Sequence, residues 1–432
     1  MGAGPGVIIP LHEAGQKGDD LVGGKARGLG RLLAAGYRVP DGFCIPTPAY
    51  ERFLAEANLA DVIHMELGRK AFSDMRWEEI WDAALRIRSA FLAISIPPDL
   101  ADPIVDAFQA LRPGEVAVRS SAPGEDASER SFAGLHESQV GIRDSSSLLD
   151  AVRIVWASLW SDAALLYRKE LGLDVAHSRM AVVVQEFEFA SVSGVAFGRD
   201  PRSPQDDKQI LEAVPGSCGD LVTGAVDPDR WVLRRSTGEI EEWTKGRRLD
   251  AGSAPLLGNG DLENLHTVLL AVEGLLASPP DLEWTGRGSE LTLLQARPLT
   301  GKPKEEDERT WYLSLRPGDQ SLAALCERVA GQLIPALEAE GAHFTAQGLA
   351  TLTDDELADA IDARVEAHER WKKVYKEEFI PFAHGVRRFG QYYNDALRPE
   401  DPYEFVELLE HQPMMASARN LALADLAEQV RS

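Results

Sequence analysis

The feature that most constrains this chain is a β-hairpin pattern close to position 290. The chain reads DLEWTGRGSELTLLQAR from Asp281 to Arg297. Side chains alternate between the two faces of a strand, so Asp281 and Glu283 are predicted on one face. Gln295 and Arg297 share a face of the return strand, and TGRGSE supplies the turn. The pattern therefore predicts two strands that present two carboxylates, an amide and a guanidinium.

These side chains suit a divalent cation together with a phosphate. Mg²⁺ prefers hard oxygen ligands and is often held by carboxylates and substrate phosphates, so Asp281, Glu283 and Gln295 are candidate ligands. Arg297 would neutralise phosphate charge. The alternative is an exposed face with a cross-strand ion pair worth roughly 0.2–1 kcal/mol. Periodicity leaves both interpretations open.

A second segment, LVGGKARGLG at residues 21–30, has the glycines and the lysine of a phosphate-binding loop. The P-loop pattern places Ser or Thr after the lysine and spaces its glycines differently. Ala26 follows Lys25, so the hydroxyl that would bind magnesium is missing and a Walker-type site is disfavoured. Taken alone, the segment is typical of a surface lysine in a turn before a helix.

A third segment reads VAVRSSAPGEDASERSFAGLHES from Val116 to Ser138. We expect a short strand that ends at Arg119, followed by a loop of small residues that includes Ser120, Ser121 and Gly134. Small residues let backbone N–H groups approach an anion, and an arginine at the strand end offers a planar fork for phosphate oxygens. A flexible, solvated polar loop is an equal alternative.

A fourth segment, MAVVVQEF, predicts a buried strand that ends on Gln185. An amide at that position can pair with an adenine edge. The simpler interpretation is a capped core strand. Elsewhere the pattern predicts helices over 146–172 and 261–277, a charged linker at 301–310, and mostly helix beyond about 318.

Composition excludes several classes of protein. Lys and Arg total 45 and Asp and Glu total 69, a net charge of −24. A nucleic-acid or anionic-membrane surface needs a basic footprint, so we expect neither partner. The three cysteines are far apart, which predicts neither a zinc site nor a disulfide framework and fits a cytoplasmic protein. The N-terminus does not read as a signal peptide, and no apolar run has membrane-spanning length.

Taken in order, eight motifs resemble one known family. They are GGKARGLG, VPDGF, VAVRSSAPGED, SFAGLHES, MAVVVQ, SGVAFGRDP, GSCGDLVTGAVDPD and DLEWTGRGSELTLLQARPLT. Over about residues 20–300 the chain is similar to the N-terminal ATP-binding domain of phosphoenolpyruvate synthase, pyruvate phosphate dikinase and rifampin phosphotransferase. The resemblance implies an α+β, ATP-grasp fold with two facing subdomains, 1–185 and 186–302. A helical linker or partner-docking region, 303–432, follows.

The resemblance also implies ATP and Mg²⁺ as cofactors, and transfer of the β-phosphoryl group to a histidine on a mobile domain, leaving AMP and phosphate. The residues implied as catalytic are Arg297, Arg119 and Lys25. The residues implied as nucleotide-binding are Lys25, Arg119, Gly134, Ser138, Gln185, Glu283, Gln295 and Arg297. The implied metal ligands are Asp281, Glu283 and Gln295.

Within this set, Gly134 and Ser138 would belong to a loop over the triphosphate, and Gln185 would read the adenine side. Some positions depart from the family pattern. Gly198 stands where Thr is common, SCGD replaces G-L-G-E, and Pro123 with Gly124 should change loop stiffness. These departures put nucleotide geometry in doubt more than nucleotide binding.

The larger departure is that no Thr/Ser-His-Ala-type motif occurs, and His384 has bulky and basic neighbours that indicate a structural or interfacial role. We therefore expect the phosphohistidine swivelling domain and an acceptor-binding domain on another chain, as in phenylphosphate synthase, or on a part absent from an excised piece. The chain would be a dikinase-type phosphotransferase component. The alternative is a non-catalytic nucleotide-sensing or scaffold module on the same fold. The final phosphoryl acceptor is not specified by the sequence.

Overall fold

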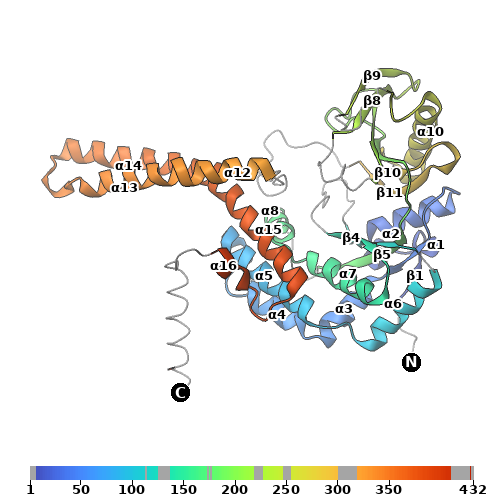
Figure 1. Cartoon of the computed structure of the whole chain (residues 1–432), viewed down its shortest axis with the longest axis horizontal. Coiled ribbons are helices and arrows are strands. Elements are labelled where there is room, and N and C mark those ends of the chain that lie inside the picture. The colour runs from blue at the N-terminus through green and yellow to red at the C-terminus, as the bar shows by residue number, and fades with distance from the viewer. Residues whose placement is uncertain are drawn as a thin grey trace. The chain divides into compact units, whose positions relative to one another are not determined.

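The computed structural model describes residues 6–111, 114–124, 137–172, 175, 178–217, 227–246, 254–299, 319–409 and 429. The chain divides into two compact units, Met1–Arg309 and Thr310–Ser432. The first unit combines helices with two antiparallel sheets, and the described part of the second is helical (Figure 1). The predicted mixture of helix and sheet is confirmed.

The first sheet has five strands in the order β1-β2-β5-β3-β4. The strands are β1 (Ile9–Pro10), β2 (Gly42–Ile45), β3 (Val116–Ser121), β4 (Ser138–Ile142) and β5 (Ala181–Glu186). The helices of this half are α1 (Leu11–Ala14), α2 (Asp19–Ala34), α3 (Thr47–Glu56), α4 (Leu59–Leu67), α5 (Trp77–Ala93), α6 (Pro98–Leu111), α7 (Ser145–Ser158) and α8 (Asp162–Glu170), with a 3₁₀ turn at Phe72–Asp74. Central strand β5 is buried through Val182, Val183 and Val184, as its apolar run predicts.

The second sheet has six strands in the order β11-β10-β6-β7-β8-β9. The strands are β6 (Val192–Phe197), β7 (Lys208–Pro215), β8 (Asp229–Arg234), β9 (Ile240–Thr244), β10 (Pro280–Thr285) and β11 (Thr292–Pro298). Helix α10 (Asn259–Leu276) packs against β10, β11 and β6, and a 3₁₀ turn at Gly288–Glu290 lies in the hairpin connection. The hairpin expected from the sequence is therefore present, with β10 and β11 antiparallel.

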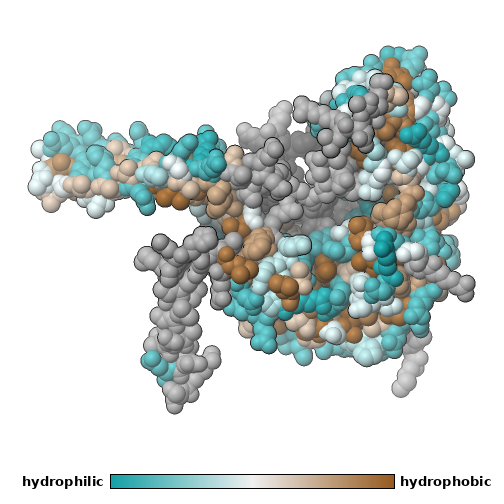
Figure 2. All heavy atoms as spheres, in the orientation of Figure 1, coloured by the Kyte–Doolittle hydropathy of each residue, from teal (hydrophilic) through white to brown (hydrophobic). Residues whose placement is uncertain are grey.

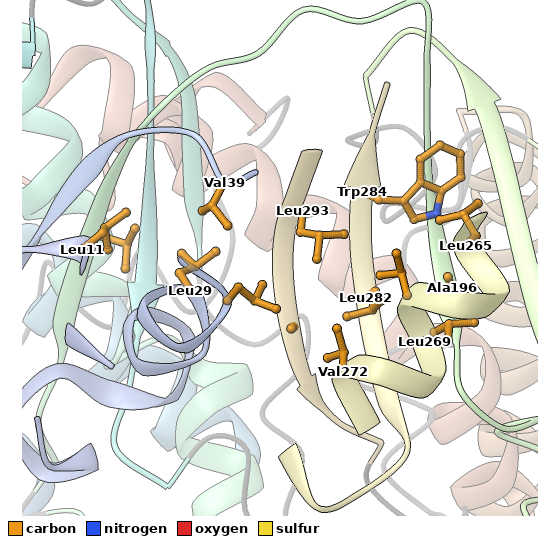
Figure 3. Packing of buried hydrophobic residues seen from close by; sticks show 14 of the residues in the cluster. Leu11, Leu29, Val39, Ala196, Leu265, Leu269, Val272, Leu282, Trp284 and Leu293 are labelled. Atoms are coloured by element: carbon orange, nitrogen blue, oxygen red, sulfur yellow. The ribbon is translucent and has the colours of Figure 1, made fainter. Parts of the chain in front are cut away.

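One hydrophobic core continues from the first sheet through α2 to the second sheet and α10. Figure 3 shows Leu11 and Leu29 on one side of this core and Leu269, Leu282 and Leu293 on the other. Helix α2 is the shared element, because its buried side chains belong to this core and the helix packs against strands of both sheets. The glycine-rich segment of the sequence is thus a packing helix that connects the two sheets.

Three glycines of α2 allow this close packing. Gly23 has φ +72°, which interrupts the helix, and a Cβ there would lie 2.0 Å from the Ser121 carbonyl oxygen. A Cβ on Gly28 would lie 2.6 Å from the Ala296 carbonyl oxygen of β11, and one on Gly30 would lie 2.2 Å from the Gly15 nitrogen. These contacted atoms belong to the backbone and cannot shift without disturbing neighbouring strands or helices. Glycine is therefore required at these three positions by close contact with other segments of the same chain.

One local prediction was wrong and another is refined. Strand β3 does not end at Arg119 but continues through Ser120 and Ser121, whose side chains are buried. The helical character expected over 146–172 is confirmed, and the segment forms two helices, the second of which is capped by Ser161, whose Oγ accepts a hydrogen bond from Ala164 N at 3.2 Å.

The described part of the second unit consists of helices. They are α12 (Asp319–Arg328), α13 (Ile334–Ala346), α14 (Asp354–Val374), α15 (Ile380–Leu397) and α16 (Glu404–Leu409), with π-helical turns at Val329–Leu333 and Tyr375–Phe379 and a 3₁₀ turn at Leu349–Thr351. Trp371 Nε1 of α14 donates to Glu340 Oε2 of α13 at 2.6 Å, which ties these two helices together. Figure 2 shows that the surface of α13 and α14 is largely hydrophilic, with apolar residues interspersed. Among the residues described, no helix has the length and apolar character needed to cross a membrane.

The packing of α2 on β11 predicts opposite effects for two helical glycines. Gly28→Ala should lower the free energy of unfolding by about 1–3 kcal/mol, because its Cβ meets a backbone carbonyl in a packed core. Gly274→Ala in α10 has open space around its Cβ and should raise stability by about 0.5–1 kcal/mol. Chemical denaturation measures both, and equal effects would contradict this role of Gly28.

Candidate functional site

The candidate site begins with the face of the β10–β11 hairpin. The strand register pairs Asp281 with Arg297 and Glu283 with Gln295. These four residues therefore lie on one face of the second sheet, which confirms the arrangement predicted from alternation. Figure 1 places this hairpin at the edge of the second sheet, next to α2.

A β-bulge interrupts the hairpin at this point. Glu283 pairs with Gln295, whereas Trp284 pairs with Leu293, so Leu294 is an extra residue in β11. The carbonyl oxygen of Leu294 accepts a hydrogen bond of 2.8 Å from Arg119 Nη1. The bulge thus supplies a backbone acceptor beside the polar face, which alternation alone did not predict.

Arg119 of β3 joins the first sheet to this hairpin. Its Nη2 donates to a Glu283 carboxylate oxygen and, at 3.0 Å, to Gln295 Oε1. The side chains of Arg119 and Glu283 are 15% and 18% exposed. Charge-assisted hydrogen bonds in such a sheltered place are stronger than those between neutral groups. One guanidinium therefore links both strands of the hairpin to the opposite sheet.

A second ion pair lies on the same face, two residues further along each strand of the hairpin. Arg297 donates from Nε and Nη2 to Asp281 Oδ2, at 2.8 and 2.6 Å. Burial raises the pKa of Asp281, and the attraction of Arg297 only partly offsets this effect. Burial also acts to raise the pKa of Glu283, but Arg119, Arg297 and Lys25 outweigh it and hold that pKa below its ordinary value.

Lys25 lies close enough to Glu283 to lower the pKa of that carboxyl. Its Nζ donates to Ser120 Oγ at 3.4 Å, so the lysine of α2 reaches the strand that carries Arg119. Ser121 holds the helix there, since its Oγ accepts from Ala26 N at 3.1 Å and donates to Val22 O at 2.7 Å. Contrary to the loop prediction, Ser120 and Ser121 act from a strand.

The remaining predicted residues are placed differently. Ser138 starts β4 and is the direct cross-strand neighbour of Arg119, with an exposed side chain. Gln185 ends up 2% exposed, and its Nε2 donates to Pro40 O at 3.4 Å. Gly134 lies outside the described residues. The structure thus brings six predicted side chains together, and the adenine-reading role of Gln185 stays a prediction. The six are Lys25, Arg119, Asp281, Glu283, Gln295 and Arg297.

The oxygen donors fit a magnesium ion. Glu283 and Gln295 direct oxygens from adjacent strands at the same atom, Arg119 Nη2. Two hard oxygens that share one cationic partner are placed to share a metal cation. Within the described ranges no three His, Cys, Asp or Glu side chains form a metal-binding group. Mg²⁺ is typically held by one or two protein ligands with phosphates and water, which matches a donor set of this size.

Gly198, where the family pattern often has Thr, has a structural explanation. A Cβ at Gly198 would lie 2.4 Å from Pro280 Cδ, so the chain passes close to the start of β10. The Gly198 nitrogen also donates to Pro280 O at 2.7 Å. A larger residue at position 198 would push the end of β6 away from β10, the strand that carries Asp281. No pattern in the sequence indicated this contact.

Comparison with known proteins gives the family. Residues 19–312 match the model of the pyruvate phosphate dikinase, AMP/ATP-binding domain. The match spans more than half of the chain, so the chain belongs to this family and the recognition made from its motifs is confirmed. The family's description names AMP/ATP binding. The matched residues include every side chain of the candidate site.

Named relatives agree with this family. The phosphoenolpyruvate synthase of Aeropyrum pernix is 34% identical over 357 residues, covering 70% of this chain and 43% of that protein. A probable phosphoenolpyruvate synthase of Methanothermobacter thermautotrophicus is 31% identical, covering 69% and 47%. A rifampicin phosphotransferase of Streptomyces sviceus is 33% identical, covering 68% and 36%. The chain therefore spans less than half the length of these relatives.

Among solved structures, a dinucleotide-forming acetyl-coenzyme A synthetase from Ca. Korarchaeum cryptofilum matches 46% of this chain and 80% of its own. The sequence identity is 12% and the TM-score is 0.27. No shared fold follows from a score of that size.

The opposite pKa shifts predict opposite pH dependences of stability. The lowered pKa of Glu283 adds stability above its unfolded value of about 4.3, and this gain is lost as pH falls through the folded value. The stability difference between wild type and Glu283→Gln should therefore shrink on acidification.

Asp281 provides the comparison. Its raised pKa makes ionisation unfavourable in the folded state, so its contribution to stability should fall as pH rises through the folded value. Denaturation of wild type, Glu283→Gln and Asp281→Asn across acidic pH measures both trends. Parallel pH dependences for the two variants would contradict the assignment.

Proposed function

We propose that this chain is the ATP-binding component of a dikinase-type phosphotransferase. It would use Mg-ATP to phosphorylate a histidine on a swivelling domain. In this reaction an imidazole nitrogen takes the β-phosphoryl group, water takes the terminal phosphoryl group, and AMP and phosphate leave. Family membership supports ATP as the substrate.

The observation that carries the proposal is the meeting of three cations with three oxygen-donor side chains between two sheets. Lys25 and Arg119 belong to the first half, whereas Arg297 and its acidic neighbours belong to the hairpin of the second. Phosphoryl transfer depends mainly on positioning and on stabilisation of charge. An ATP-grasp arrangement supplies these from two facing subdomains, which we assign to 1–185 and 186–302.

Each side chain has a proposed role. Lys25 binds nucleotide phosphates, Arg119 contacts the phosphates undergoing transfer, and Arg297 stabilises charge on the moving phosphoryl group. Asp281, Glu283 and Gln295 would hold Mg²⁺, which when bound neutralises phosphate charge and orients the phosphate chain. In the free chain these groups pair with one another, so nucleotide binding exchanges internal ion pairs for contacts with phosphate and metal.

Gly134 and Ser138 are proposed to cover the triphosphate, and Gln185 to face the adenine. We assign 303–432 to a helical linker or docking region for the histidine-bearing partner. The swivelling histidine domain and the acceptor-binding domain are proposed partners, and the relatives' greater length supports the existence of such additional parts.

Transfer of label tests this function. The chain would be mixed with a histidine-domain partner and Mg-ATP labelled at the β-phosphate. We expect acid-labile label on the partner histidine, with AMP produced in equal amount. A partner variant with that histidine replaced by Ala is the control. If ATP binds but no partner ever acquires label, the chain is instead a nucleotide-sensing or scaffold module.

Arg297→Ala should abolish phosphoryl transfer, lowering kcat by roughly 10²–10³, because the lost guanidinium acts on charge that develops in the transition state. Rates of AMP formation at saturating ATP measure this effect. Arg287→Ala is the matched control, since Arg287 is an exposed arginine at the turn end of the same hairpin. Equal rates in the Arg297→Ala variant and the control would refute this role.

Lys25→Ala should mainly weaken nucleotide binding. Loss of one charge-assisted contact costs about 1.5–3 kcal/mol, which raises Kd for Mg-ATP roughly 10- to 150-fold. Calorimetric titration measures the change. Lys17→Ala is the control, because the one ion pair of Lys17 among the described residues is with the exposed Glu13. Unchanged affinity in Lys25→Ala would remove this lysine from the site.

A further inference from the structure

Helix α2 is interrupted just before Lys25. Gly23 has φ +72° and ψ +168°, although the residues on both sides of it are helical. Positive φ is costly for a residue that has a side chain, so glycine at this position permits the interruption. In a regular α-helix the Ala26 N–H would donate to the Val22 carbonyl oxygen, four residues earlier. The interruption therefore falls within the helical turn that contains Lys25.

The hydroxyl of Ser121 lies in this interrupted turn. Ser121 Oγ accepts a hydrogen bond from Ala26 N at 3.1 Å and donates one to Val22 O at 2.7 Å. One side-chain oxygen of β3 thus binds the two backbone groups that would pair with each other in a regular helix. Insertion of a side chain between such groups is a known cause of helix kinks. Because both hydrogen bonds are buried, loss of the hydroxyl would leave these two backbone groups to find another partner.

Ser121 has no surface left for a nucleotide. Its side chain is 0% exposed, and its hydroxyl both donates to and accepts from α2. A Cβ on Gly23 would lie 2.0 Å from Ser121 O and 2.5 Å from Ser121 Oγ, so the strand and the kink are in direct contact. Any effect of Ser121 on a nucleotide must therefore pass through α2.

The part of α2 that follows the kink is held against both sheets. At its start, Ser121 binds the backbone of Ala26, the residue next to Lys25. Further along, a Cβ on Gly28 would lie 2.6 Å from Ala296 O, so the helix also packs closely on β11 of the hairpin. The backbone position of Lys25 is thus set by one hydroxyl of β3 and by close packing on the hairpin.

We propose that Ser121 is a positioning residue for Lys25. Its hydroxyl keeps the Ala26 N–H and the Val22 carbonyl apart, and this fixes the point from which Lys25 reaches Ser120 and the nucleotide phosphates. Without the hydroxyl these two backbone groups would pair directly, the turn would tighten, and the ammonium group would move. The inference rests on the proposed function, which assigns nucleotide phosphates to Lys25, and adds a residue that acts only through this lysine.

A double-mutant cycle tests the proposal. Calorimetric titration with Mg-ATP compares the full-length wild type with Ser121→Ala, Lys25→Ala and the double variant. We expect Ser121→Ala to raise the Kd for Mg-ATP about fivefold or more, but to change it less than about twofold when residue 25 is already Ala. A general loss of stability would act equally in both backgrounds. Equal effects in the two backgrounds, or wild-type affinity in Ser121→Ala, would overturn the positioning role.

Ser158→Ala is the matched control. Ser158 is also 0% exposed, and its hydroxyl likewise donates to a helix carbonyl oxygen, that of Val155, at 2.7 Å. This variant should leave the Kd for Mg-ATP unchanged, and chemical denaturation checks that each variant is folded. If Ser158→Ala weakens binding as much as Ser121→Ala, the effect belongs to any lost buried hydroxyl and the proposal is wrong.

Ser121→Cys gives a second measurement if Ser121→Ala fails to fold. The thiol keeps a side chain in the kink but is only a weak donor and acceptor, so Mg-ATP binding should again weaken, and only when Lys25 is present. Unchanged affinity would contradict the proposal. A wild type that binds no Mg-ATP would overturn the proposed function and this inference together. An affinity that falls in Lys25→Ala but not in the Ser121 variants would overturn the positioning role alone.

Discussion

The structure of the first unit depends on the guanidinium of Arg119. It extends from β3 of the first sheet and holds Glu283, Gln295 and the bulged Leu294 carbonyl of the second. Removing one partner of a sheltered ion pair leaves an uncompensated charge, which is far more costly than losing an exposed pair. Because α2 packs through Gly28 against β11, the hairpin is held at the distance that this arginine can span.

This arrangement explains how one set of residues serves both the free chain and the proposed complex. In the free chain, Arg119 pairs with Glu283 and Arg297 with Asp281, so neither carboxylate of this cluster lacks an opposite charge. Mg-ATP brings both a cation for the carboxylates and an anion for the arginines and Lys25. The proposed site can therefore exchange partners without exposing a buried charge.

Sequence patterns predicted the hairpin and its shared polar face, because strand alternation depends only on neighbouring residues. They also predicted the buried strand before Gln185 and the helix before the hairpin. They did not predict the bulge at Leu294 or the extension of β3 to Ser121, because both depend on the hydrogen-bonding groups of the segment that packs opposite. The glycines after Val22 suggested a phosphate loop, whereas their role is close backbone packing that only the assembled fold reveals. The motifs named the six clustered side chains as candidate site residues, but they did not predict the ion pairs that hold these side chains in the free chain.

In the proposed function, Glu283 and its neighbours exchange Arg119 for magnesium when ATP binds. The most direct measurement is the affinity for ATP with Mg²⁺ and with a chelator, in wild type and in Glu283→Gln. We expect wild type to bind ATP at least about tenfold more tightly with Mg²⁺, because the metal supplies the cation that this carboxylate requires. Glu283→Gln should bring the two affinities close together. Equal ATP affinity with and without Mg²⁺ in wild type would contradict this exchange of Arg119 for magnesium.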